Sequence, residues 1–131
     1  TATFSAAGTY VLRLTANDTA ASAFAEVTIT VNPALPSNQP PVVSAGAAQT
    51  ITLPAGATLA GSVTDDGLPT GATVTSQWTQ QSGPGTTTFA NAASPQTTAT
   101  FSVAGTYVLR LTASDTAASA FAEVTITVNP A

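Results

Sequence analysis

An internal repeat is the feature of this sequence that most limits what the chain can fold into. Residues 1–34 recur as residues 98–131, offset by 97 positions, and only two of the 34 positions differ. The differences are Ala6 against Val103 and Asn17 against Ser114. Because self-similarity at a fixed offset marks a repeated structural unit, we expect residues 35–131 to form one complete repeat. Residues 1–34 are then expected to be the C-terminal hairpin of a preceding repeat, together with the start of a linker.

A proline-rich segment separates the two copies. Residues 32–41 read Asn-Pro-Ala-Leu-Pro-Ser-Asn-Gln-Pro-Pro, with four prolines in ten positions. Proline restricts the residue before it to extended backbone, and proline-rich segments act as semi-rigid spacers. We therefore assign the linker to residues 33–41 and the folded domain of the complete repeat to residues 42–129.

Alternation of apolar and polar residues predicts an all-β fold for the complete repeat. Apolar residues make up 44% of the chain and charged residues only 6%. The abundance of Thr, with Gly and Pro at intervals, favours strands and turns over long helices. A unit of 97 residues is also the size of one immunoglobulin-like β-sandwich. The predicted strands are residues 42–44, 50–53, 57–63, 73–80, 86–89, 97–103, 106–113 and 120–128.

The last two predicted strands show the clearest inward and outward faces. Tyr107, Leu109 and Leu111 form the apolar face of the first, with Arg110 and Thr112 pointing outward. In the second strand, Val124 and Ile126 alternate with polar residues. This pattern is typical of antiparallel strands with one buried face. Trp78 is the single Trp of the chain, so we expect it at the centre of the core. The residues expected around it are Ile51, Leu53, Leu59, Val74 and Phe101.

A family resemblance is carried by motifs spread over most of the complete repeat. The motifs are Pro40-Pro41-Val42-Val43-Ser44-Ala45-Gly46, Gln49-Thr50-Ile51-Thr52-Leu53, Leu59-Ala60-Gly61-Ser62, Gln77-Trp78-Thr79-Gln80 with Ser82-Gly83-Pro84, and Ala104-Gly105-Thr106-Tyr107 with Leu109-Arg110-Leu111. Together they resemble the PKD-type, REJ-like immunoglobulin-like repeat domains of bacterial or archaeal surface proteins. The resemblance implies an antiparallel β-sandwich of seven to nine strands, in tandem repeats, that acts as a spacer, stalk or interaction module outside the cell.

The residue inventory argues against catalysis and against a nucleic-acid partner. The chain has no His and no Cys, and its two basic residues are Arg13 and Arg110, so it lacks Lys as well. Ser and Thr hydroxyls therefore have no ordinary base to activate them. The net charge of −4 leaves no basic surface for a phosphate backbone. We expect a protein segment that is not an enzyme, binds no nucleic acid and has no span within a membrane.

Three carboxylates are the candidate metal ligands. Asp65 and Asp66 fall in one predicted loop and Asp115 in another. In an immunoglobulin-like sandwich these loops lie at the same end, beside the entering linker, where Asn38 could complete a calcium site. The alternative is that Asp65 and Asp66 form an ordinary turn and that Asp115 caps the last hairpin. No cofactor other than calcium is indicated.

Two further residues carry recognisable local patterns. Tyr107 follows a Gly at the start of a strand, as in the tyrosine corner of immunoglobulin-like domains, and its expected role is structural. Asn17 opens an Asn-Asp-Thr glycosylation sequon, but the other copy of the repeat has Ser114 at that position.

These observations favour an extracellular structural protein. The near-identity of the two copies predicts a repeat module of a long cell-surface protein that forms a stalk, fibre or filament, with an adhesive role. Its expected partners are other copies of the same repeat, since the sheet edges lack the Lys and Glu that usually prevent association. The alternative is an accessory domain of a secreted hydrolase that binds carbohydrate or protein.

Overall fold

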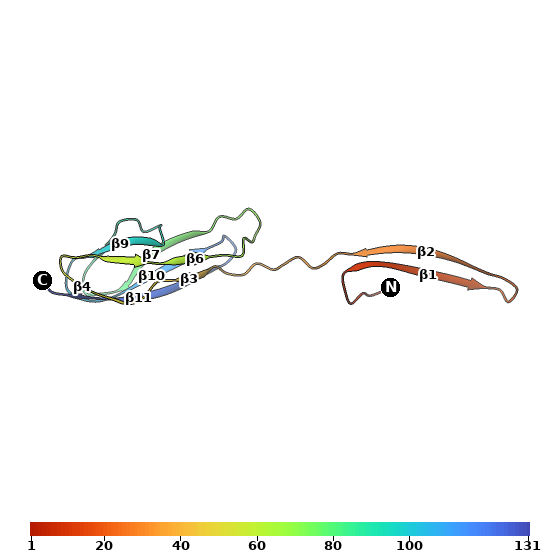
Figure 1. Cartoon of the computed structure of the whole chain (residues 1–131), viewed down its shortest axis with the longest axis horizontal. Helices are drawn as coiled ribbons and strands as arrows, with labels where there is room; N and C mark the ends of the chain where they lie inside the picture. The colour runs from red at the N-terminus through yellow and green to blue at the C-terminus, as the bar shows by residue number, and fades with distance from the viewer. The chain divides into compact units, whose positions relative to one another are not determined.

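The computed structural model describes all 131 residues and divides the chain into two compact units, Thr1–Pro36 and Ser37–Ala131 (Figure 1). Both units consist of β-strands and connecting loops. No helix long and apolar enough to cross a membrane is present.

The first unit is a two-stranded antiparallel hairpin. Its strands are β1 (Gly8–Asn17) and β2 (Ser22–Val31), paired without a register shift from Gly8 opposite Val31 to Asn17 opposite Ser22. In the turn, the carboxylate of Asp18 accepts the amide N–H groups of Ala20 and Ala21 at 3.1 and 2.9 Å. This side chain therefore closes the hairpin locally.

The second unit is a sandwich of nine strands, which confirms the predicted fold class. One sheet has the order β4-β11-β10-β7, in which β4 runs parallel to β11 and the other neighbours are antiparallel. The opposite layer contains the pair β3–β6 and the sheet β5-β9-β8. The strands are β3 (Val42–Ser44), β4 (Gln49–Thr52), β5 (Ala57–Ala60), β6 (Ser62–Thr64), β7 (Thr75–Ser82), β8 (Thr87–Phe89), β9 (Gln96–Phe101), β10 (Gly105–Ser114) and β11 (Ser119–Asn129).

A glycine divides a segment that the alternation predicts as one strand. Residues 57–63 separate at Gly61 into β5, which pairs with β9, and β6, which pairs with β3. The amide of Gly61 donates to the carbonyl of Pro95 at 3.1 Å. A Cβ at Gly61 would lie 2.6 Å from that oxygen and 2.8 Å from Leu111, so the close approach of backbone and core requires glycine here.

The core lies between the two layers and is centred on Trp78. Trp78 is 1% exposed, and Tyr107, Leu109, Leu111 and Ile126 are fully buried. Leu59, Phe101 and Val124 belong to the same cluster, against which Ile51 and Leu53 pack while partly buried. The expectation for Val74 is wrong, because this side chain is 37% exposed. Val74 precedes β7, so the alternation of that strand does not extend to it.

The edge of β7 is covered by hydrogen bonds rather than by charge. The amide of Trp78 donates to the carbonyl of Ala92 at 2.7 Å. The side chain of Gln80 donates to the carbonyl of Gly85 and accepts from the amide of Thr87, both at 2.7 Å. The chain between β7 and β9 thereby occupies an edge that would otherwise be free to pair with another strand.

Candidate functional site

Asp115 lies buried at the start of the turn that follows β10. One of its carboxylate oxygens accepts the amides of Ala117 and Ala118 at 2.8 and 2.7 Å. The other oxygen accepts the side-chain amide of Asn38 at 3.0 Å. The Ala118 amide has the largest effect in lowering the pKa of Asp115; burial opposes it, and the Asn38 amide lowers the pKa further. Asp115 therefore joins the last hairpin to the segment that enters the sandwich.

Asp66 makes the second contact with the entering segment. One of its oxygens accepts the backbone amide of Gln39 at 3.0 Å, and the other accepts the amide of Leu68 at 2.9 Å. Asp65 accepts the amide of Gly67 at 3.0 Å. The loop of Asp65 and Asp66 and the turn of Asp115 thus lie at the end of the sandwich where the chain enters. The carboxylates of Asp65 and Asp66 both accept backbone amides of their own turn.

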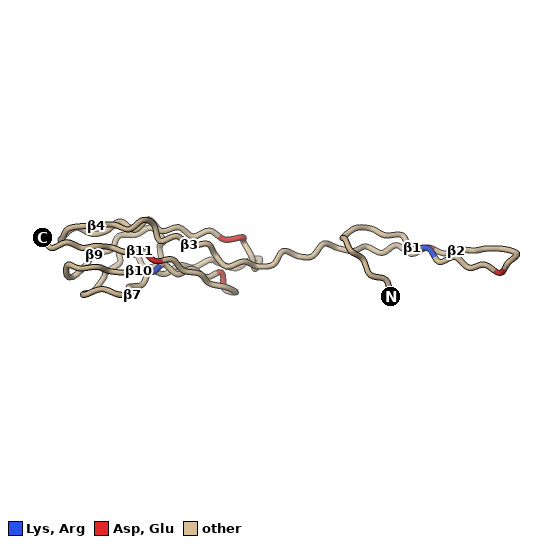
Figure 2. The backbone as a smooth tube through the Cα atoms, turned by 90° about the horizontal axis from the view of Figure 1, so that it is seen from below, with Lys and Arg blue, Asp and Glu red and all other residues tan.

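Asp65, Asp66 and Asp115, the predicted calcium ligands, do not come together as a metal-binding group in this structure. No group of three acidic side chains lies close enough to hold a metal. In the structure, backbone amides and the Asn38 side chain bond to carboxylate oxygens of all three residues. Figure 2 shows how sparse charged residues are along the chain. The geometry favours the alternative, in which Asp65 and Asp66 shape a turn and Asp115 caps a hairpin.

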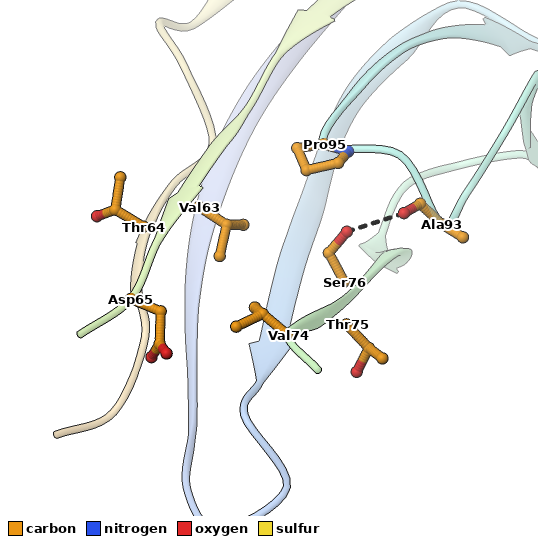
Figure 3. Close-up of a pocket in the computed structure, with 8 residues that line it drawn as sticks. All are labelled: Val63, Thr64, Asp65, Val74, Thr75, Ser76, Ala93 and Pro95. Carbon is orange, nitrogen blue, oxygen red and sulfur yellow. Dashed lines mark hydrogen bonds between the residues drawn. The ribbon is translucent and has the colours of Figure 1, made fainter. Parts of the chain in front are cut away.

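A groove of about 560 Å³ lies beside this end of the sandwich (Figure 3). Asp65 is its one ionisable lining residue, and its hydroxyls come from Thr64, Thr75 and Ser76. The Ser76 hydroxyl donates to the carbonyl of Ala93 at 2.9 Å. The rest of the lining is Val63, Val74, Ala93 and Pro95. This lining can contact a ligand through apolar groups and hydroxyls, but it offers no nucleophile paired with a base.

Tyr107 and Asn17 occupy local structural positions. The hydroxyl of Tyr107 donates to the carbonyl of Val103 at 2.8 Å, which is the bond expected of a tyrosine corner. Asn17 is the exposed last residue of β1. Neither residue contacts Asp65, Asp66 or Asp115 through a hydrogen bond, and neither lines the groove.

The outer face of the β10–β11 hairpin contains a group that the sequence reasoning missed. Arg110 forms an ion pair with Glu123 at 2.7 Å, and its guanidinium lies 4.0 Å from the ring centre of Phe121. Phe121 is 57% exposed. The signal in the sequence is the cross-strand register, which places Arg110 opposite Glu123. Such a solvent-exposed ion pair adds little to the stability of the sandwich.

Comparison with known proteins identifies the family. The model of the K319L-like PKD domain matches residues 45–128. The solution structure of the PKD domain from KIAA 1837 protein is similar at 28% identity, covering 76% of this chain and 93% of that chain, with a TM-score of 0.54. The PKD domain of human KIAA0319 gives 25% identity, coverage of 72% and 86%, and a TM-score of 0.55.

A third similar structure shares the fold at low sequence identity. It is the surface layer protein SbsC, domains 1–6, with 14% identity, coverage of 95% of this chain and 17% of that chain, and a TM-score of 0.50. The family match extends from the loop after β3 to the last strand of the sandwich, and so includes the core around Trp78. The chain belongs to the K319L-like PKD domain family.

Proposed function

We propose that this chain is a structural repeat module of a long protein at the cell surface, where successive sandwiches form a stalk, fibre or filament. The observation that supports this proposal is the structural identity of the two hairpins. β1–β2 and β10–β11 have the same strand pairing, position for position, along nearly the same sequence. A chain that repeats one domain at a fixed period produces a quasi-one-dimensional assembly, because each unit contacts mainly its neighbours.

The chemistry of the sandwich agrees with a mechanical role. The groove's one carboxylate, Asp65, accepts the amide of Gly67, and the Ser76 hydroxyl donates to a backbone carbonyl. The carboxylates of Asp66 and Asp115 bond to turns and to the entering chain. The contacts of Asn38 and Gln39 fix the first residues of the unit to two loops of the sandwich. Such contacts restrict the direction in which the chain enters each module, which favours a spacer over a flexible tether. The fold shared with a surface layer protein supports a location at the cell surface.

Two measurements on the full-length protein test the proposal. Antibodies raised against residues 37–131 should label intact producing cells, and stretching single molecules should give a series of unfolding events of equal length, one for each repeat. Labelling only after the cells are broken would contradict the surface location. A single sandwich next to a catalytic domain, together with retention of residues 37–131 on a polysaccharide column, would instead support the accessory-domain alternative.

A further inference from the structure

The β1–β2 hairpin exposes an apolar face whose counterpart in the second unit is buried. Leu14 is 76% exposed, whereas its counterpart Leu111 is fully buried. Val27 is 53% exposed, and its counterpart Val124 is 4% exposed. We call this surface the hairpin face, and it consists of Tyr10, Leu12, Leu14, Ala25, Val27 and Ile29.

In its other features the hairpin already has the conformation that it has inside a sandwich. The Tyr10 hydroxyl donates to the carbonyl of Ala6 at 2.7 Å, as Tyr107 does to Val103. Arg13 pairs with Glu26 at 2.7 Å, as Arg110 does with Glu123. Its guanidinium lies 4.1 Å from the ring centre of Phe24. The difference between the two hairpins is therefore the cover over the apolar face, not the shape of the face.

The second unit shows what covers such a face. Trp78 lies opposite Leu111 in the pairing of β7 with β10, and β4 pairs with β11 along its last four residues. Trp78 and Leu59 pack in the core against the face of β10–β11. These strands come from residues 37–97, and no equivalent of Trp78 or Leu59 occurs in residues 1–36.

We infer that the hairpin face binds a second copy of the segment 37–97, with β1 pairing to the β7 of that copy and β2 to its β4. This inference rests on the proposed function as a repeat module. It goes further, because it names the surface that joins one repeat to another and the segment that it accepts. Each Leu or Val that becomes buried adds hydrophobic stabilisation relative to its exposed state.

The outer edges of the hairpin favour this partner over another hairpin. A bare two-stranded hairpin is marginal in water, and stacking two hairpin faces would cover the apolar side chains alone. The backbone N–H and C=O groups on the outer edges of β1 and β2 would still lack partners. A second copy of residues 37–97 covers both, because β7 and β4 pair with these edges in the second unit.

A chain with a second copy of residues 37–97 joined before Thr1 tests the inference. In amide NMR spectra, the signals of residues 1–34 should move to the positions of residues 98–131, because nearly identical sequences would then share one environment. Amide exchange at Leu12 should slow to the rate at Leu109. Signals of residues 1–34 that stay where they are in the 131-residue chain would overturn the inference.

Matched substitutions in the extended chain separate docking from general stability. Leu12→Asp should return the signals of residues 1–34 to their undocked positions, whereas Thr28→Asp, whose counterpart Thr125 is exposed, should not. Residues 98–131 report in the same spectrum that the other sandwich stays folded. An unchanged spectrum for Leu12→Asp would overturn the inference.

The rival partner and the proposed function are tested separately. If, in sedimentation experiments, the 131-residue chain forms dimers that Leu12→Asp abolishes, and the amide signals of residues 98–131 are the same in monomer and dimer, the partner is another hairpin and the inference is wrong. A monomeric 131-residue chain supports it. None of these results depends on where the protein is located, so failure of the surface-labelling experiment would reject the proposed function and leave the docking result intact.

Discussion

The side-chain amide of Asn38 donates a hydrogen bond of 3.0 Å to the carboxylate of Asp115, 77 residues further along the chain. Asp115 uses both of its oxygens, one for this bond and one for the amides of Ala117 and Ala118. Asp115→Asn has only one oxygen, so either the turn or the entering segment loses its acceptor. We expect a lower melting temperature for the sandwich, measured by the fluorescence of Trp78.

Asp18→Asn is the matched control for this substitution. Asp18 occupies the equivalent turn of the β1–β2 hairpin and uses a single oxygen for Ala20 and Ala21. Because Asp18 lies in the first unit, its substitution should leave the Trp78 transition unchanged. Equal melting temperatures for Asp115→Asn and the unchanged protein would show that the contact between Asn38 and Asp115 adds no stability.

Acid should weaken the sandwich through the same carboxylate. The amide of Ala118, more than any other group, holds the pKa of Asp115 below its ordinary value, which is about 3.9 in an unfolded chain. The unfolded state therefore takes up a proton more readily than the folded state. The contribution of ionised Asp115 to the free energy of unfolding is fully present above about pH 4. It is lost as the pH falls through the pKa of Asp115 in the folded state. Urea midpoints between pH 6 and 2.5 should fall more steeply for the unchanged protein than for Asp115→Asn, and parallel curves would contradict this.

Removal of calcium should leave the melting temperature unchanged. Two oxygens at the end of the sandwich, Asn38 Oδ1 and Asp65 Oδ1, are buried without a hydrogen-bond partner. They fall far short of the roughly six to eight oxygen ligands that calcium prefers. Melting curves in millimolar calcium and in EDTA should therefore coincide. A higher melting temperature in calcium would show that the turns rearrange around the ion and would restore the metal hypothesis for Asp65, Asp66 and Asp115.

Trp78→Ala should destabilise the sandwich by about 3–5 kcal/mol, the usual cost of removing a buried aromatic side chain. Trp78 is 1% exposed and stacks on Phe89 with ring centres 6.4 Å apart. Urea unfolding followed by circular dichroism measures the loss. The unchanged protein should also show blue-shifted fluorescence that moves to longer wavelength on unfolding. Emission typical of water-exposed indole in the folded state would contradict the burial of Trp78.

Trp78→Phe is the control that keeps an aromatic ring. It removes the indole N–H that donates to the carbonyl of Pro95 at 3.1 Å. That carbonyl also accepts the amide of Gly61, so it is not left without a partner. The loss should be smaller than for Trp78→Ala, at about 1–2 kcal/mol, because smaller changes in core volume cost less.

The parts of the fold that could be predicted are those with a local signal. The alternation in β10 and β11 depends only on neighbouring residues, and it places Leu109 and Val124 on the buried face. The break at Gly61 depends on Pro95, which is 34 residues away, so no window around Gly61 contains it. Val74 occupies an apolar position of the predicted alternation. The strand β7 begins one residue after it, however, and the Val74 side chain stays partly exposed.

The candidate site was harder to predict for the same reason. The topology of the sandwich brings the loops of Asp66 and Asp115 to one end, and that much follows from the fold class. Which atoms meet there does not follow from the fold class, because a carboxylate can bind a metal, a backbone amide or a side-chain amide. The contacts of Asn38 and Gln39 decide between these partners, and they depend on the path of the entering chain.

Gly83→Ala should destabilise the sandwich more than a glycine substitution at an open position. Gly83 follows β7 with a φ of +150°, and a Cβ there would overlap the ring of the buried Tyr107, at 2.7 Å from Cε1. Gly71 also has positive φ, at +83°, but a Cβ would meet nothing within 4 Å. Ala at either position incurs backbone strain of about 1–3 kcal/mol, and only Gly83→Ala adds the overlap with Tyr107. Overpacking of this kind costs about 1–3 kcal/mol more. The two variants should therefore differ by that amount in urea unfolding followed by Trp78 fluorescence, and equal midpoints would mean that Tyr107 moves aside without cost.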